Sequence, residues 1–425
     1  MTQQVDCLVR GAEQVVTCAG PIPKRGSLLS DIGLQPEASI ASMDGRIVYI
    51  GSEKNLLSHC RPTEDCVEID ASGMVLLPGF VDSHNHLPFA GSREEEFALR
   101  LKGATYQELS ARGMGIQTSV SATRRVPPAE LKSLCLKRLD TMLLHGTTTS
   151  EAKSGYGLNL EDEIKQLEAV RDAGAEHPID LIPTFLGAHE VPGEYKSRKE
   201  DYISLIIDRV IPEVRRLGLA EFFDIFCEEG VYSIEESRRM IRAAKAAGFK
   251  IKIHADEFVS LGGAQLAAEE GALSAEHLIA VSEEGISRLA ESETAAVLLP
   301  GVSFFLMQEQ KAPARRLIDS GAIVALATDF NPGSSMTESM LFIFQLGVFT
   351  LGMNIEETIN AVTANGAYAV GRQLDTGSLE PGKKMDLIFC DMPSYQFLAY
   401  HMGINPVRHV MKGGRLVVKD RCLVR

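Results

Sequence analysis

The sequence predicts an α/β fold: a TIM-like (β/α)8 barrel with a small β domain built from both chain ends. Three observations support this prediction. Short apolar runs alternate with helical patterns in the middle of the chain, and strand and turn signals dominate both ends. Roughly 300 residues lie between those ends, and such a barrel typically needs about 250. We expect residues 75–373 to form the barrel, and residues 1–74 and 374–425 to form the two parts of the small domain.

The composition excludes several classes of protein. The 425 residues include 43 Lys and Arg against 57 Asp and Glu, and the formal net charge of −14 argues against a nucleic-acid partner. No apolar run approaches the roughly 18 residues of a membrane helix, and the first residues lack the basic and apolar regions of a signal peptide. The eight cysteines are scattered without a Cys-x-x-Cys pair, which is typical of reduced thiols. We therefore expect a soluble, cytoplasmic protein with no membrane partner.

Both chain ends carry hairpin signals. The turn residues Asp44 and Gly45 precede a predicted strand at 46–50, and Gly413 and Gly414 precede another apolar run. Because the two ends of a domain often lie close together, we expect these β segments to pair with each other and form one small domain.

The middle of the chain supplies the predicted barrel strands. Helices between them are indicated by two capping-box patterns, Ser233 with Glu236 and Asn354 with Glu357. An open doubly wound sheet is the competing fold, but no Gly-x-Gly-x-x-Gly follows an early strand. The predicted strands are residues 75–81, 147–150, 181–186, 222–227, 251–254, 273–276, 295–299 and 323–328.

Four residues of metal-ligand type follow or end these strands. His84 and His86 come after the first run, His254 ends the fifth, and Asp329 follows the eighth. Polar residues at the carboxyl ends of barrel strands face the active-site mouth, and two histidines two positions apart on an extended chain point the same way. A satisfied core histidine and a helix N-cap would explain His254 and Asp329 separately. Together, three imidazoles and one carboxylate suit zinc or ferrous iron.

Motifs along nearly the whole chain resemble those of the imidazolonepropionase family, amidohydrolases of histidine degradation. Asn85 departs from the family pattern, in which a threonine stands between the two histidines, but its side chain is expected to face away from the metal ligands. The resemblance depends on the segments PGFVDSHNHLPFAGSREEEFALRLKGATYQEL, GTTTSEAKSGYGL, TFLGAHEVP, KIHADEF, SAEHL, ALATDFNPGSS and GSLEPGKKMDLIFCD.

The resemblance implies a metal-dependent hydrolase barrel that opens the ring amide of 4-imidazolone-5-propanoate to give N-formimino-L-glutamate. It also implies one divalent metal ion per subunit, zinc or iron, and a homodimer. Another cyclic-amide hydrolase or deaminase of the amidohydrolase superfamily is the alternative, because fold and metal ligands do not fix the substrate. A barrel that has lost catalysis is a further alternative.

Ring opening requires proton transfer as well as a metal. Glu257 lies just past the fifth run and His277 at the end of the sixth, so either could shuttle protons together with Asp329. A solvated acid and a buried structural histidine are the alternative interpretations. Lys153 is interpreted as structural or as a support for the metal ligands, because the resemblance implies one metal and a lysine that bridges two metals would not fit such a site.

The substrate of this family is anionic. A guanidinium can bind a carboxylate at two points, so Arg93 is the predicted carboxylate anchor; its alternative is a surface arginine paired with Glu94 or Glu95. Further substrate-binding residues are expected after the second, third and eighth strands, and Glu257 also belongs to this set. They are Tyr156, His189, Asn331, Gly333 and Ser334.

Overall fold

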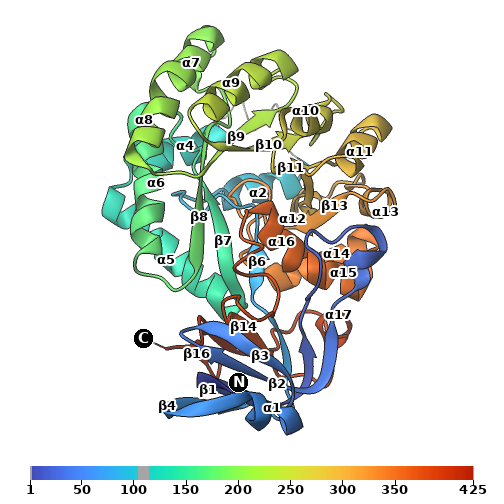
Figure 1. Cartoon of the computed structure of the whole chain (residues 1–425). Helices are drawn as coiled ribbons and strands as arrows, with labels where there is room; N and C mark the ends of the chain where they lie inside the picture. The colour runs from blue at the N-terminus through green and yellow to red at the C-terminus, as the bar shows by residue number, and fades with distance from the viewer. Residues whose placement is uncertain (1, 104–113, 425) are drawn as a thin grey trace.

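Two sheets organise the chain, one closed into a barrel and one at its side (Figure 1). The computed structural model describes residues 2–103 and 114–424, so the end of the first resemblance segment lies outside the described residues. Among the described residues, no helix combines the length and apolar character that crossing a membrane requires.

The barrel sheet contains eight strands in sequence order, and every neighbouring pair is parallel. Their large apolar side chains, such as Phe185 and Phe223, are completely buried. The fold class is therefore confirmed as a (β/α)8 barrel. The strands are β6 (Phe80–Asp82), β7 (Thr147–Lys153), β8 (Asp180–Ala188), β9 (Phe222–Cys227), β10 (Lys250–Ala255), β11 (Ser274–His277), β12 (Ala295–Leu298) and β13 (Ile323–Leu326).

The predicted first strand, 75–81, is wrong as a single element. Its first half forms β5 (Val75–Pro78), which pairs with strands of the terminal sheet, and only β6 belongs to the barrel. Gly79 separates them, and a Cβ there would lie 2.1 Å from the hydroxyl oxygen of Thr148. The run is continuously apolar because both halves are buried, so periodicity gives no sign of the change of sheet.

The second sheet joins the two ends of the chain, as predicted. Its order is β17-β16-β15-β14-β5-β1-β2-β3, with β4 beside β1. Both predicted hairpins form, with positive φ at Asp44 and Gly45 and at Gly413 and Gly414. The strands are β1 (Gln3–Val16), β2 (Leu34–Met43), β3 (Arg46–Ser52), β4 (Cys60–Asp70), β14 (Leu387–Cys390), β15 (Val407–Lys412), β16 (Arg415–Lys419) and β17 (Cys422–Leu423).

Helices surround the barrel, and both predicted capping boxes are present at Ser233 and Asn354. The helices of the barrel region are α2 (Glu94–Leu101), α4 (Ile116–Arg125), α5 (Pro128–Leu144), α6 (Leu160–Gly174), α7 (Lys199–Leu205), α8 (Ile211–Leu217), α9 (Ile234–Ala246), α10 (Gly263–Glu270), α11 (Glu283–Ala290), α12 (Pro300–Phe305), α13 (Ala314–Asp319), α14 (Met340–Leu351), α15 (Ile355–Ala361) and α16 (Ala364–Ala369). Shorter elements are η1 (Gly26–Ser30), α1 (Glu53–His59), η2 (Gly193–Tyr195), η3 (Ile206–Val210) and α17 (Phe397–Tyr400).

Candidate metal centre and active site

The main chain holds the residues after the first and last barrel strands together. The N–H of Asp329 donates to the carbonyl of His84 at 2.9 Å, and the N–H of His86 donates to the carbonyl of Phe330 at 3.0 Å. Asp329 has a φ of +47°, which few non-glycine residues adopt. This bridge closes the barrel beyond β6 and β13 and places the side chains at its carboxyl end.

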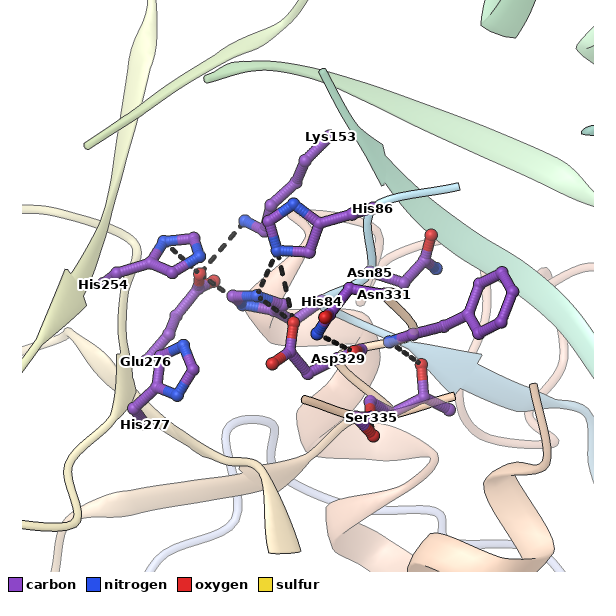
Figure 2. Close-up of polar contacts among 12 residues, drawn as sticks. His84, Asn85, His86, Lys153, His254, Glu276, His277, Asp329, Asn331 and Ser335 are labelled. Carbon is purple, nitrogen blue, oxygen red and sulfur yellow. Dashed lines mark hydrogen bonds and ion pairs between the residues drawn. The ribbon is translucent and has the colours of Figure 1, made fainter. Parts of the chain in front are cut away.

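Two histidines and one carboxylate converge at this closure. The Nε2 atoms of His84 and His86 lie 3.3 Å apart, and each lies 3.2 Å from Oδ1 of Asp329. Figure 2 shows both imidazoles turned toward this carboxylate. All three side chains are buried. Asn85, between the histidines, donates instead to Asp82 and Ser150, so the family departure at this position points away from the cluster.

Two further imidazoles complete the cluster. The ring of His254, on β10, lies with its centroid 4.6 Å from that of His84, and the ring of His277, at the end of β11, lies 5.1 Å from that of His254. Ligand atoms of His84, His254 and His277 all lie within 4.8 Å of one another. His277 therefore lies as close to the cluster as the predicted ligands do.

These residues fit a divalent metal ion. Nε2 of His254 is buried and has no hydrogen-bond partner among the residues that the structure describes. Leaving such polar atoms buried and unpaired is costly unless they bind a ligand. A donor set of imidazoles and one carboxylate is typical of catalytic zinc or ferrous iron sites.

A layer of charged side chains lies directly beneath the histidines. Lys153 Nζ contacts carboxylate oxygens of Asp224 at 2.6 Å, Glu151 at 2.9 Å and Glu276 at 3.0 Å. Lys252 Nζ contacts Glu151 at 2.7 Å and Glu276 at 2.9 Å. These five side chains, the buried ionic layer, are completely shielded from solvent. The contacts of Lys153 agree with either predicted role, structural or supporting the ligands, and the other four members were not identified from the sequence.

The charges of the buried ionic layer shift the pKa of His84. Burial alone lowers the pKa of His84, but the adjacent Glu276 carboxylate raises it to about 9. Although burial also opposes ionisation of Glu276, His84 and the two lysines hold the pKa of this carboxylate well below its usual value. Glu276 and the His84 ring therefore favour the charged form of each other.

A cavity of about 330 Å³ opens onto the histidine cluster. Its walls include every residue predicted to bind substrate, together with Asp329 and His277. The sequence did not indicate several other lining residues, among them Glu96, Arg100 and Phe226. The predicted residues Arg93, Tyr156, His189, Glu257, Asn331, Gly333 and Ser334 thus share one space.

Comparison with known proteins agrees with this geometry. The model of the amidohydrolase family matches residues 75–417. Imidazolonepropionase from Symbiobacterium thermophilum is 51% identical over 417 residues, 98% of each chain, and that from Geobacillus kaustophilus is 48% identical, covering 97% of this chain and 98% of its own. The chain belongs to the imidazolonepropionase family of amidohydrolases. The predicted hydrolase class is therefore confirmed, and the family model extends from the barrel into the terminal sheet.

Solved structures with the same fold include metal-bound enzymes. An adenosine deaminase from Xanthomonas campestris with bound zinc has a TM-score of 0.72 at 18% identity, covering 100% of this chain and 95% of its own. A variant of atrazine chlorohydrolase from Arthrobacter aurescens TC1, complexed with zinc and atraton, has a TM-score of 0.76 at 17% identity, covering 98% and 96%. At this identity the likeness supports the fold alone.

The imidazolonepropionase fold brings the two predicted proton carriers together. Oε2 of Glu257 lies 3.5 Å from Nδ1 of His277. Burial, followed by the charges of Asp329 and Glu228, raises the pKa of Glu257 well above its usual value, whereas burial lowers the pKa of His277. His277 also has a φ of +71°, a conformation typical of functional sites in non-glycine residues. Burial therefore disfavours the charged form of both groups.

A second carboxylate fixes the loop that carries Glu257. Glu228, at the end of β9, accepts the main-chain N–H groups of Glu257 and Phe258 at 3.0 Å each and of Val259 at 3.3 Å. It is 2% exposed. No pattern in the sequence indicates this role of Glu228, because an acid after a strand is usually solvated.

The substrate-side residues support one another. The His189 and His86 rings stack with centroids 5.0 Å apart, and the Tyr156 ring lies 5.4 Å from that of His189. The side-chain oxygen of Asn331 accepts the N–H groups of Gly333 and Ser334 at 2.8 and 2.9 Å. Asn331 thus shapes the turn that lines the cavity.

Proposed function

We propose that this enzyme hydrolyses the ring amide of 4-imidazolone-5-propanoate to N-formimino-L-glutamate. The observation that supports this proposal most strongly is the convergence of His84, His86, His254 and Asp329 in a chain about half identical to imidazolonepropionases along its length. We assign these four residues to one divalent metal ion, zinc or iron. When bound, such an ion lowers the pKa of water and polarises a carbonyl group.

The protein's own groups move the protons. Water adds its oxygen to the ring carbonyl carbon, the bond from that carbon to the ring nitrogen breaks, and the nitrogen takes up a proton. Glu257, His277 and Asp329 line the cavity where this happens. Oε2 of Glu257 lies 3.5 Å from Nδ1 of His277, so a proton passes between them through one bridging water or after a small approach of the two side chains. Fixing the Glu257 loop through Glu228 reduces the reorganisation that proton transfer requires.

The rest of the cavity binds and orients the substrate. We assign Arg93 to the propanoate, and His189 and Tyr156 to the ring, with Asn331, Gly333 and Ser334 along the opposite edge. Tyr156 is 2% exposed and packs against His86, one of the proposed ligands.

Turnover of 4-imidazolone-5-propanoate, followed by the loss of its ultraviolet absorbance, tests the proposal. We expect hydrolysis that a chelator abolishes and that zinc or ferrous iron restores. Metal-dependent hydrolysis of a different cyclic amide or deamination, with no turnover of this substrate, would favour the alternative activities of the superfamily. Homodimerisation and a cytoplasmic location stay predictions alongside this function.

A further inference from the structure

Arg93, the predicted carboxylate anchor, is already paired inside the cavity. Its Nε lies 2.9 Å from Oε2 of Glu96, and its Nη2 lies 2.6 Å from Oε1 of the same carboxylate. The pairing residue is thus neither Glu94 nor Glu95. Glu96 is 7% exposed, and its Oε2 also accepts the N–H of Gly115 at 2.9 Å. The positive charge of Arg93 is therefore compensated before any substrate binds.

Arg100 lines the same cavity and has no such compensation. Arg93 is the residue just before α2, Arg100 lies near the end of α2, and both line this cavity. Within residues 2–103 and 114–424, Arg100 forms no ion pair, and its buried Nε has no hydrogen-bond partner. Its Nη2 donates to the carbonyl of Gly333 at 2.9 Å.

Aromatic rings determine where the Arg100 guanidinium lies. Its central carbon is 5.6 Å from the ring centroid of Phe305 and 6.0 Å from that of Phe97, which also stack on each other. Burial lowers the pKa of Arg100 because the surroundings desolvate its charge. A desolvated guanidinium with unused donors is suited to binding an anion.

Both arginines meet at Gly333. A Cβ at this position would lie 2.1 Å from Nη1 of Arg93, while the Gly333 carbonyl accepts the Arg100 hydrogen bond. The absence of a side chain at Gly333 lets the two guanidiniums approach the same wall of the cavity. Arg93, Glu96 and Arg100 together leave one positive charge uncompensated there.

We propose that Arg100 is a second carboxylate-binding residue, which supplies the uncompensated charge for the substrate's propanoate while Glu96 holds Arg93 in place. This inference rests on the proposed function for the identity of the substrate. The recognition itself requires only an anionic group on a small ring compound. Arg93 and Arg100 would then bind the two oxygens of one carboxylate from either side of Gly333.

Binding of 3-(imidazol-4-yl)propanoate and of its neutral amide, measured by calorimetry on the metal-loaded enzyme, tests the inference without requiring turnover. We expect Arg100→Met to weaken binding of the propanoate by about 30-fold or more, the scale for losing one partner of a desolvated charge pair, and to leave binding of the amide nearly unchanged. Arg100→Lys, which keeps the charge but loses the planar fork, should recover part of the affinity.

Lys102→Met is the matched control, because it removes a positive charge from an exposed position at the end of the same helix. We expect wild-type affinity for both ligands. Equal losses for propanoate and amide in Arg100→Met, or no loss for either, would overturn the assignment. Because these measurements do not depend on hydrolysis, an enzyme that binds the propanoate through Arg100 but turns over another ring amide would refute the proposed function alone.

Discussion

Nδ1 of His84 lies 2.5 Å from Oε2 of Glu276, and Nδ1 of His254 lies 3.0 Å from Oδ2 of Asp224. Each carboxylate faces the ring nitrogen that points away from the centre of the cluster. Partners of this kind fix the orientation and tautomer of a metal-binding imidazole and leave Nε2 available. Lys153 contacts both carboxylates, so one buried ammonium group links the supports of two proposed ligands.

Glu276→Gln tests this support. We expect metal affinity to fall by about 10- to 100-fold, the usual effect of losing such a partner, because an amide is a weaker acceptor than a carboxylate for the His84 N–H. Competition with a chelator measures the affinity directly, and circular dichroism checks the fold.

Glu151→Gln is the matched control for the buried ionic layer. Glu151 contacts Lys153 and Lys252 as Glu276 does, but its other contact is Thr184. We expect Glu151→Gln to reduce the stability of the protein and to lower its metal affinity less than Glu276→Gln does. If the two variants lose metal equally, Glu276 acts through the charge balance of the layer and not through His84.

Replacing a proposed ligand should lower the metal content more than replacing Glu276 does. We expect His254→Ala to lose most of its metal and activity while the barrel stays folded, because a catalytic site sits between strands that are packed independently of it. Elemental analysis of the purified variant checks the metal content. His145→Ala, whose imidazole bonds to the carbonyl of Thr141 away from the cluster, should retain full metal. Full occupancy in His254→Ala would refute the ligand assignment.

Proton transfer can be separated from metal binding. We expect Glu257→Gln and His277→Asn to keep wild-type metal content and to reduce kcat by about 100-fold or more, the usual effect of removing a general acid or base. Because His277 lies within 4.8 Å of His84 and His254, metal loss in His277→Asn would instead make it a ligand. Wild-type turnover in both variants would show that Glu257 and His277 are structural and do not transfer protons.

Sequence reasoning located the cluster of histidines and Asp329 because strand ends are visible as changes of pattern. His84, His254 and Asp329 each follow an apolar run, and parallel strands of a barrel must bring such positions together. The same reasoning missed Glu276 and Asp224, because a charged residue inside a strand gives no sign of the lysine or histidine that will face it from a neighbouring strand. Such pairing depends on register between distant segments.

Sequence-based prediction of the cavity residues is limited in the same way. Arg93 was predicted because a guanidinium can bind the carboxylate of the substrate that the family resemblance implies, but its pairing with Glu96 depends on the geometry of one helical turn. Arg100 resembles any surface arginine of a short helix until Gly333, more than 200 residues away, is folded against it. Contacts of this kind follow from the tertiary structure and not from local pattern.

The last prediction concerns the junction of the two sheets. Lys412, at the end of β15, contacts Asp180 of β8 and Asp386, each at 2.6 Å. Asp386 is 2% exposed, so Lys412→Met leaves a buried carboxylate without its cation. We expect the free energy of unfolding at pH 7 to fall by about 3 kcal/mol. Lys384→Met, which removes a more exposed contact to Asp180, should cost at most about 1 kcal/mol.

The difference between wild type and Lys412→Met should depend on pH. Burial alone would raise the pKa of Asp180, but Lys412 and Lys384 hold it below 3.8, so its contribution is present above that value and disappears as the pH falls through the folded pKa. Burial alone would lower the pKa of Lys412, but Asp386 and Asp180 raise it above 10.5, so its contribution is full below 10.5 and is lost as the pH rises through the folded pKa. Urea unfolding across this range should therefore give the largest difference near neutral pH and a smaller one at both extremes. A difference that stays constant from acid to alkaline pH would show that Lys412 stabilises the junction through its aliphatic stem and not through its charge.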